Sequence, residues 1–529
     1  MRRRLLLIAL LALAFPASAS AATVFFVPGH GWGHGIGMSQ YGAQGFATRA
    51  NPPKTYDWIL AHYYSGTTLM QLSRNPSVKV LLADGRLSLT IGSAARFTVT
   101  DSAGHTFKLA ARDHRIGPGL RIVDVNGNAH RLASPARFRP GTRPLRLSGR
   151  SYRGWFGVNS TGTSLSAVNH VGLEQYIYGV VPREMPSSWA PEALKAQAVA
   201  ARSYAYVAVA ANVPYLYPDT RSQVYGGISA ETTASNAAVD ATARQVVAYN
   251  GRAVRTYFFS TSGGRTAAAE DGPWGSGPIP YLKSVDDPFD DISPYHTWGP
   301  IRYTSAALAR RAGGPAGLRD ATVAVNPSLR ADSVTLVGAS ATRTISGATF
   351  QYRLGLRSTW FRIRVLSLTA ARRKITYGGA VKLSGFERGL DGIGVQLRAY
   401  GGSWESPTAV SPDSSGHFEV IAKPSVTTSY RATSSAGRGA VIQVAVAPRV
   451  RVGYARGVFS GSVAPAGAAA GHTVSIQRRT ASRWTTVASG TIRADGSFRV
   501  AARAAAGTYR ARVALGGGYA VGTATIAVP

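Results

Sequence analysis

The 529-residue sequence contains no cysteine. Disulfides, thiolate metal sites and cysteine nucleophiles are therefore excluded. Acidic residues are also scarce, 25 against 59 lysines and arginines, which leaves a formal net charge of +34. Beyond residue 22, no stretch approaches the roughly 20 apolar residues that a membrane-spanning helix needs. Hydrophobic residues still make up 45% of the chain, enough for large cores, and the length predicts about two to four domains.

The positive charge comes mainly from arginine, because only eight of the cations are lysines. In an intracellular protein this excess would indicate nucleic acid binding. The first residues, MRRRLLLIALLALAFPASASAA, instead have the basic, apolar and small-residue sections of a secretory signal peptide, predicted over 1–21 with cleavage near Ala21. We therefore expect a protein that is secreted or held at the cell wall. Its polyanionic partners would be wall polymers and not nucleic acid, and a solvated arginine surface without a partner is the open alternative.

The sequence pattern changes near Val365. Before that residue, strands, helices and glycine- or proline-rich loops are mixed. Alternating residues over 78–100 predict a β-meander, and a proline at the first turn followed by an apolar stripe predicts a helix over 191–209.

After Val365 the chain is expected to be all-β and to repeat itself. Trp404 precedes Phe418 by 14 residues, and Trp484 precedes Phe498 by the same number. Two copies of about 80 residues with short strands predict immunoglobulin-like sandwiches over 365–448 and 449–529. The repeated aromatic residues, including both tryptophans, are interpreted as core positions.

Residues 29–44 read GHGWGHGIGMSQYGAQ, with glycine at every odd position from Gly29 to Gly37. No frame completes a dinucleotide fingerprint, and no lysine follows to complete a phosphate-binding loop. His30 and His34 have no Cys, Asp or Glu nearby to complete a zinc shell. Two interpretations stay open on these residues alone, a tight turn that glycine permits and the wall of a substrate cleft.

Two further stretches carry a resemblance. Residues 173–206 read LEQYIYGVVPREMPSSWAPEALKAQAVAARSYAY, and residues 256–289 read TYFFSTSGGRTAAAEDGPWGSGPIPYLKSVDDPF. Together with HGIGMSQYGAQ, they resemble the SpoIID/LytB family, the stage II sporulation protein D and amidase-enhancer group, over roughly 23–364. The resemblance implies an α+β catalytic-type domain over 22–364, followed by the two all-β sandwiches.

Enzymes of that family are lytic transglycosylases that cut the MurNAc–GlcNAc bond of peptidoglycan and leave a 1,6-anhydro-MurNAc end. The resemblance places the catalytic glutamate of the E-M-P motif at Glu184. A single carboxyl group suffices, because the C6 hydroxyl of the substrate is the nucleophile. The same group acts as acid and then as base. Such an acid needs a raised pKa, and Val180, Val181 and Trp189 provide apolar neighbours.

Other polar residues of the three stretches are predicted to contact the glycan. Gln197 and Arg202 lie on the helix that follows the acid, and a polar strip with glycines runs from 257 to 265. Glu270 and Asp271 match an E-D pair of the family and are expected to hold sugar hydroxyls or brace a loop, whereas Asp286 and Asp287 are interpreted as turn residues. The predicted glycan contacts are His34, Ser39, Gln40, Gln197, Arg202, Tyr257, Ser260, Ser262, Gly264, Arg265, Glu270 and Asp271.

The sequence departs from the family in two ways. Some members carry zinc on cysteine and histidine near the STSGG stretch, but residues 250–280 contain neither, so no metal or other cofactor is expected. In many members the glycine loop also follows the segment that here reads LGLRSTWFRIRV, whereas in this chain it comes first. This order predicts a circular permutation in which 358–364 lies beside 23–28.

Two functions remain open at this stage. The first is an exported lytic transglycosylase, with peptidoglycan glycan strands as substrate and anionic wall polymers as partners of the basic tail. The second is a non-enzymatic amidase enhancer that binds wall glycan and stimulates a cell-wall amidase. A buried Glu184 with a raised pKa favours the first, and an exposed Glu184 with an ordinary pKa favours the second.

Overall fold

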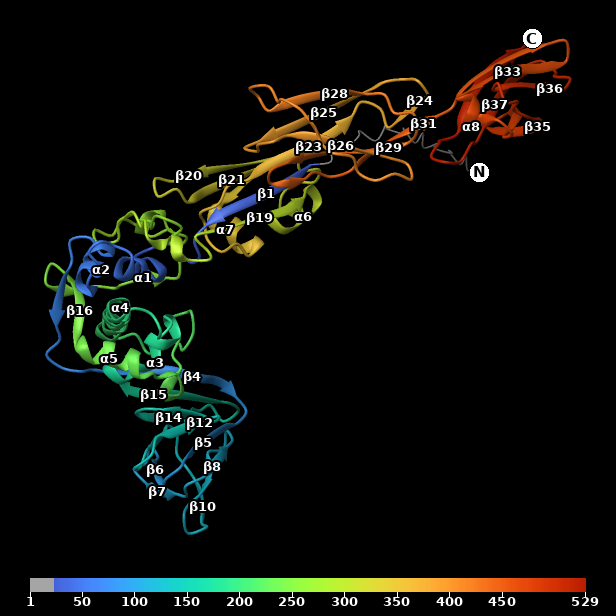
Figure 1. Cartoon of the computed structure of the whole chain (residues 1–529). Coiled ribbons are helices and arrows are strands. Elements are labelled where there is room, and N and C mark those ends of the chain that lie inside the picture. Colours follow the sequence, from blue (N-terminus) through green and yellow to red (C-terminus); the bar gives the residue numbers. More distant parts are fainter. Residues whose placement is uncertain (1–22) are drawn as a thin grey trace, which may run out of the picture.

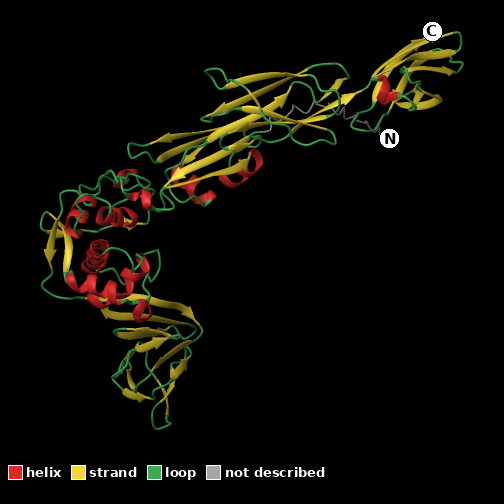
Figure 2. Ribbon diagram, viewed as in Figure 1, coloured by secondary structure: helices red, strands yellow, loops and turns green. Residues whose placement is uncertain are grey.

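The computed structural model describes residues 23–529. The predicted signal peptide therefore lies outside the described residues. The chain forms an elongated molecule in which helices gather near the middle, while strands build a lobe at one end and a long arm at the other (Figures 1 and 2). No helix within 23–529 is long and apolar enough to cross a membrane.

The terminal lobe is built from two sheets between residues 77 and 172. The larger sheet has the order β4-β15-β14-β11-β6-β7, and the smaller has the order β13-β12-β5-β8. Their bounds are Ser77–Arg86 (β4), Leu89–Ser93 (β5), Phe97–Thr100 (β6), Thr106–Leu109 (β7), Asp113–Ile116 (β8), Ala136–Arg139 (β11), Leu145–Leu147 (β12), Arg150–Tyr152 (β13), Trp155–Ser160 (β14) and Leu165–Gly172 (β15), with a hairpin of β9 (Arg121–Val123) and β10 (Ala129–Arg131).

The β-meander predicted over 78–100 is wrong in its pairing. The strands β4, β5 and β6 form where alternation predicts them, but β4 pairs with β15, β6 pairs with β7 and β11, and β5 lies in the other sheet. Alternation shows which residues face a core. It does not show which strand of a later segment becomes the neighbour.

Helices cover the inner edge of this lobe. The helix predicted over 191–209 is confirmed as α4, Pro191–Ala210, with proline at its first turn. Its alanines are buried nearly all round because α1, α2, α3 and α5 pack against it. The bounds are Gln40–Thr48 (α1), Tyr56–Tyr63 (α2), Leu173–Glu184 (α3) and Thr233–Ala241 (α5). Short strands lie beside them, Met38–Ser39 (β2), Thr68–Gln71 (β3), Gln245–Tyr249 (β16), Arg252–Ala253 (β17) and Phe258–Phe259 (β18), with 3-10 turns at Gly227–Ala230 (η1), Ala269–Asp271 (η2) and Asp290–Ile292 (η3).

A five-stranded sheet joins the helical region to the arm. Its order is β19-β1-β23-β25-β28, with bounds Thr297–Thr304, Val24–His30, Arg364–Ala370, Val381–Arg388 and His417–Ala422. The expected adjacency of the two distant segments is confirmed, because Phe25 pairs with Val365 and the Arg362 amide donates to the Pro28 carbonyl at 3.0 Å. The circular permutation itself stays a prediction.

This sheet continues across Val365, so the structure has no break there. One end is covered by α6 (Ser305–Ala312), α7 (Gly347–Leu354) and the sheet β20-β21-β22 (Asp320–Val325, Ala331–Val337, Thr342–Ser346). Val24 and Phe26 belong to the same apolar core as Leu366 and Leu383. The first strand of the described chain therefore contributes to the core of the first sandwich.

Each predicted repeat forms two facing sheets around its own core. In the first, β23, β25 and β28 face a sheet of β24 (Lys374–Thr376), β26 (Gly394–Ala399), β27 (Thr408–Ala409), β29 (Thr428–Ser434), β30 (Gly437–Arg438) and β31 (Ile442–Ala447). The second sandwich also consists of two sheets. One contains β32 (Arg449–Ala455), β33 (Val458–Ala464) and β36 (Ser497–Ala501), and it faces a sheet of β34 (Thr473–Thr480), β35 (Arg483–Thr491), β37 (Gly507–Val513) and β38 (Gly522–Val528). The short helix α8 (Ala466–Ala469) connects β33 to β34. The immunoglobulin-like topology stays a prediction.

The core positions of the repeat were only partly predicted. Phe418 and Phe498 are buried in the two cores. Trp404 and Trp484 are half-buried outside them, and each lies over an arginine guanidinium, 3.9 Å from Arg431 and 4.3 Å from Arg510. The regular spacing therefore joins a surface stack of tryptophan on arginine to a phenylalanine in the core of each copy.

Candidate active site

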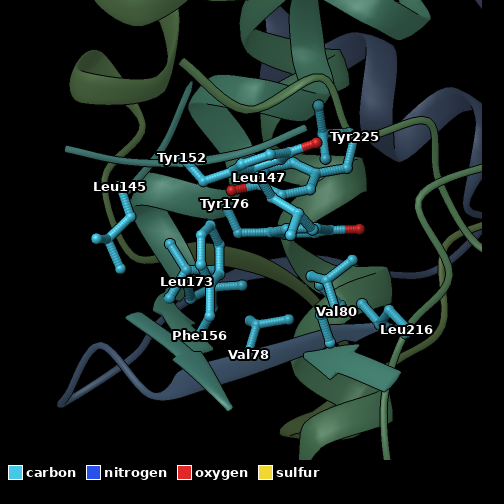
Figure 3. Packing of buried hydrophobic residues seen from close by; sticks show 14 of the residues in the cluster. Val78, Val80, Leu145, Leu147, Tyr152, Phe156, Leu173, Tyr176, Leu216 and Tyr225 are labelled. Atoms are coloured by element: carbon cyan, nitrogen blue, oxygen red, sulfur yellow. The ribbon is translucent and has the colours of Figure 1, made fainter. Parts of the chain in front are cut away.

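Glu184 is the last residue of α3. The buried face of this helix, which includes Leu173, Tyr176 and Val180, packs into the core shared with β4 and β14 (Figure 3). Met185 then takes an extended backbone conformation and ends the helix. The carboxyl group is thus fixed at the end of an element that its own core holds in place.

Burial is the main influence on the Glu184 carboxyl group. The side chain is half-buried, and this burial raises its pKa above the ordinary glutamate value. A 2.7 Å hydrogen bond from the Val224 amide to Oε1, a hydrogen bond from the Gln40 side chain and the charge of Arg183 act in the opposite direction. The group therefore exchanges a proton at a higher pH than an exposed glutamate does.

The glycine loop reaches this carboxyl group through its last residues. Gln40, the first residue of α1, contacts Glu184 and also donates to the Gln197 Oε1 atom at 3.4 Å. Beside them, the Tyr41 ring packs on Trp189 at 4.8 Å. Of the predicted glycan contacts, the structure brings Gln40 to the acid and places Gln197 next to Gln40. Both are buried, and residues 23–529 provide no acceptor for the Gln197 Nε2 atom.

The glycines of the loop serve its packing against the chain itself. A Cβ on Gly33 would lie 2.8 Å from the Phe259 Cβ, and one on Gly37 would collide with the Tyr257 carbonyl oxygen. Both residues also have a positive φ, 118° and 75°. At these two positions the close approach that glycine permits is to residues 257–259 of the protein itself, and a contact of the loop with a glycan stays a prediction.

His34 is held by the protein through both ring nitrogens. Its Nε2 donates to the Phe258 carbonyl at 3.0 Å, and its Nδ1 accepts from the Ile36 amide at 3.1 Å. Burial lowers its pKa to about 4, so the ring is neutral at physiological pH. Both ring nitrogens of His34 therefore have protein partners, and its contact with a glycan stays a prediction. No group of three or more potential ligands among residues 23–529 is placed to hold a metal ion.

A second pair of buried acids lies on the other side of the start of α1. Asp290 accepts hydrogen bonds from the Ser39 hydroxyl, the Ser262 and Gly263 amides and the His296 ring, at 2.8–3.1 Å. Asp287 accepts from the Tyr63 hydroxyl at 2.8 Å. Burial and repulsion by Asp290 raise the pKa of Asp287 to about 7. Asp287 opens a turn as predicted, because its carbonyl accepts from the Asp290 amide at 3.3 Å, but its side chain is fully buried, which the sequence did not indicate.

This pair changes the role of several predicted glycan contacts. Ser39 and Ser262 are buried and hold Asp290, and the Ser262 hydroxyl also accepts from the Gly264 amide at 3.0 Å. Arg202 is fully buried and forms an ion pair with Glu174 at 2.8 Å. These predictions fail because the sequence shows polar groups but not their internal partners. Arg265 lies at the surface, paired with Asp286 at 3.1 Å.

Glu270 and Asp271 line a cavity of about 380 Å³ together with Trp274. Trp274 is 51% exposed, and its ring packs on His34 at 4.6 Å and on Tyr257 at 5.1 Å. Asp271 accepts from the Ser328 hydroxyl at 2.6 Å, so it braces a loop, as one of the two interpretations expected. Ser260 is half-buried, and its carbonyl accepts from the Tyr41 amide at 3.0 Å.

Sequence reasoning missed three features of this region. The Val224 amide carries no side-chain signal. Asp290 is hidden in the run DDPFDD, which resembles a solvated turn. Trp274 stands in a loop rich in glycine and proline, GPWGSGP, and an exposed aromatic residue in such a loop was the available signal.

Comparisons with known proteins agree with the resemblance. The family model described as SpoIID, stage II sporulation protein, matches residues 161–249, which include Glu184. Stage II sporulation protein D of Bacillus subtilis is 34% identical over 221 residues, covering 38% of this chain and 62% of that protein. The amidase enhancer of the same organism is 35% identical over 189 residues, 35% of this chain and 25% of that protein.

Among solved structures, a two-domain fibronectin type III segment of chicken tenascin is 11% identical. It covers 30% of this chain and 97% of that one, with a TM-score of 0.21, which is too low to support an argument about the fold. The chain spans less than two thirds of the length of the curated relatives that it matches. The segment that matches the SpoIID family model contains Glu184, and the chain is similar to relatives named stage II sporulation protein D and amidase enhancer.

Proposed function

We propose that this chain is an exported peptidoglycan lytic transglycosylase that cleaves between MurNAc and GlcNAc. The observation that carries the proposal is Glu184, a half-buried carboxyl group with a raised pKa in the segment that matches the family model. Its ligands, the Val224 amide and the Gln40 side chain, fix its orientation without forming an ion pair. Export by the predicted signal peptide and retention at the wall belong to the same proposal.

The reaction needs one group that first gives and then takes a proton. Protonated Glu184 donates its proton to the glycosidic oxygen, the bond from that oxygen to C1 of MurNAc breaks, and positive charge develops on the sugar ring. The resulting carboxylate removes the proton of the C6 hydroxyl, whose oxygen then bonds to C1. The product is a 1,6-anhydro-MurNAc end, no water is consumed, and Glu184 regains its proton.

The balance of forces on Glu184 suits both halves of this cycle. Burial favours the protonated form needed for the first step. The two hydrogen bonds stabilise the carboxylate that forms next, so the intermediate is not left without partners. Trp274, with Glu270 beside it, is the exposed aromatic surface that we assign to a sugar ring further along the strand.

The second candidate function is a non-enzymatic amidase enhancer, which the similarity to the Bacillus subtilis protein of that name favours. In that case Glu184 would act as a structural ligand of the Val224 amide, and the chain would bind glycan and stimulate a wall amidase. The burial of Glu184 and its raised pKa support the enzyme over the enhancer.

The test uses the purified chain from residue 22 on intact sacculi and on glycan strands stripped of peptides. Mass spectrometry should find 1,6-anhydro-MurNAc ends that are lost in Glu184→Gln and kept in the control Glu192→Gln. Glu192 lies in the first turn of α4 and accepts a hydrogen bond from the Tyr56 amide. Reducing ends would indicate hydrolysis and contradict the mechanism. Glycan binding without cleavage, with stimulation of an amidase, would establish the enhancer.

A further inference from the structure

The two C-terminal sandwiches meet at a junction held by hydrogen bonds. The Ala520 amide donates to the Val446 carbonyl at 2.8 Å, and the Thr427 amide donates to the Gly518 carbonyl at 3.0 Å. Tyr519 packs against the cores of both sandwiches. The junction is therefore a formed structural unit and not a free linker between β31 and β32.

A cleft of about 700 Å³ opens at this junction. Arg372 and Lys374 enter it from the first sandwich, and Arg449 enters it from the start of the second. No acidic residue belongs to its lining, which also includes the hydroxyl side chains of Thr376 and Thr523 and apolar side chains such as Ile375. The cleft thus presents three positive charges from two domains and no negative one.

These three cations have no carboxylate partner within 23–529. None of the ion pairs in that part of the chain involves them. Lys374 donates to the Val521 carbonyl at 2.8 Å, its one side-chain hydrogen bond within the described part of the chain. The rest of the second sandwich does not offset these positive charges, because residues 449–529 hold eleven arginines and one acidic residue. Cations of one sign gathered in a cleft focus a positive potential that attracts anions.

The backbone of the cleft makes room for one of these cations. Gly378 has a φ of 79°, and a Cβ there would lie 2.6 Å from the Arg449 Nη2 atom. A side chain at 378 would therefore push the guanidinium out of its place. This contact is a separate observation from the charge count, because it places the Arg449 guanidinium directly against the backbone at Gly378.

We propose that this cleft binds a phosphodiester polymer of the cell envelope. Guanidinium groups bind phosphate through paired hydrogen bonds, and an ammonium group binds it as a point charge. A tetrahedral phosphate presents oxygens in three dimensions, so cations entering from two domains can share it, whereas a carboxylate is planar. The inference rests on the proposed location of the protein at the cell wall, but it does not depend on cleavage by Glu184.

The experiment measures binding of fluorescently labelled inorganic polyphosphate to the chain from residue 22, between 50 and 200 mM salt. The test variant is Arg372→Gln/Lys374→Gln/Arg449→Gln. The control, Arg483→Gln/Arg493→Gln/Arg499→Gln, removes the same charge from exposed positions outside the cleft. We expect the cleft variant to lose about tenfold to a hundredfold in affinity and to reduce the slope of log K against log salt by about 2. The control should lose less than about threefold.

Equal losses in both variants would mean that the charge acts diffusely and would overturn the proposal. So would unchanged binding by the cleft variant. Polygalacturonate, a polymer of carboxylates, serves as the second probe. If it binds as tightly as polyphosphate and depends on the same residues, the assignment to phosphodiesters is wrong. Arg449→Gln alone should show part of the slope change, so the result does not depend on the triple variant folding well.

Discussion

The carboxyl groups of Asp290 and Glu184 contact consecutive residues at the start of α1, but they differ in burial and in the number of hydrogen bonds that they accept. Ser39 donates to Asp290, whereas Gln40 contacts Glu184. Burial raises the pKa at both sites. Asp290 is fully enclosed and accepts four hydrogen bonds, whereas Glu184 is half-buried and accepts from the Val224 amide and the Gln40 side chain. A raised pKa therefore does not identify a catalytic acid unless the carboxyl group can also be reached.

The largest expected effect separates the two sites by stability. Asp290→Ala removes the acceptor of the Ser262 and Gly263 amides and of Ser39, all of which are buried. Unpaired buried donors of this kind predict a loss of about 3–5 kcal/mol in the free energy of unfolding, measured by urea denaturation. Glu184→Gln keeps an acceptor for the Val224 amide and should lose less than about 1 kcal/mol. Similar losses of unfolding free energy in Asp290→Ala and Glu184→Gln would mean that the two carboxyl groups do not differ in their contribution to stability.

The contrast between these sites also shows what could be predicted from the sequence. The E-M-P motif and its apolar neighbours led to Glu184, and the helix α4 followed from its proline and apolar stripe. Ser39, Ser262 and Arg202 were assigned to the glycan because a polar side chain in a motif looks the same whether it faces solvent or a buried partner. Their partners Asp290 and Glu174 lie up to 251 residues away in the chain. Such long-range pairing is decided by tertiary packing, which local patterns do not encode.

The second effect is a pH dependence at the enclosed site. An aspartate in an unfolded chain titrates near 3.9, whereas Asp287 in the folded chain titrates at about 7. Between these values the folded state retains a proton that the unfolded state has released. The contribution of Asp287 to stability therefore falls as pH rises from about 4 to about 7, by roughly a few kcal/mol.

Asp287→Asn isolates this contribution, because asparagine resembles the protonated acid. The buried His34 has a lowered pKa and contributes with the opposite sign, but it is common to both proteins and cancels in their difference. We expect the free energy of unfolding of the variant, relative to the original chain, to increase between pH 4 and 7 and then to level off. A flat difference would show that Asp287 is ionised in the folded protein throughout this range.

A smaller effect tests whether Ser39 belongs to the enclosed site alone. Its hydroxyl caps α1 by accepting from the Gly42 amide at 3.1 Å and donates to Asp290 at 2.9 Å. Ser39→Ala should therefore lower stability by about 1–2 kcal/mol. The rate of glycan cleavage per folded molecule should stay within about twofold, because Ser39 is buried away from the acid. A large loss of cleavage at full stability would place Ser39 in the catalytic site.

The smallest effect concerns Gln40, one residue further along. Its hydrogen bond stabilises the carboxylate of Glu184, so Gln40→Met should raise the pKa of that group by less than about one unit. Because the first step needs protonated Glu184, the alkaline limb of kcat/KM should move to higher pH by the same amount. Gln197→Met is the matched control, since Gln197 contacts Gln40 and not the acid, and its profile should move less. Two neighbouring residues would then act on two different acids, Ser39 through the stability of the fold and Gln40 through the proton on Glu184. If instead Gln40→Met lowered stability as much as Ser39→Ala and left the pH profile unchanged, both sites would be structural, and the enhancer would become the better account of Glu184.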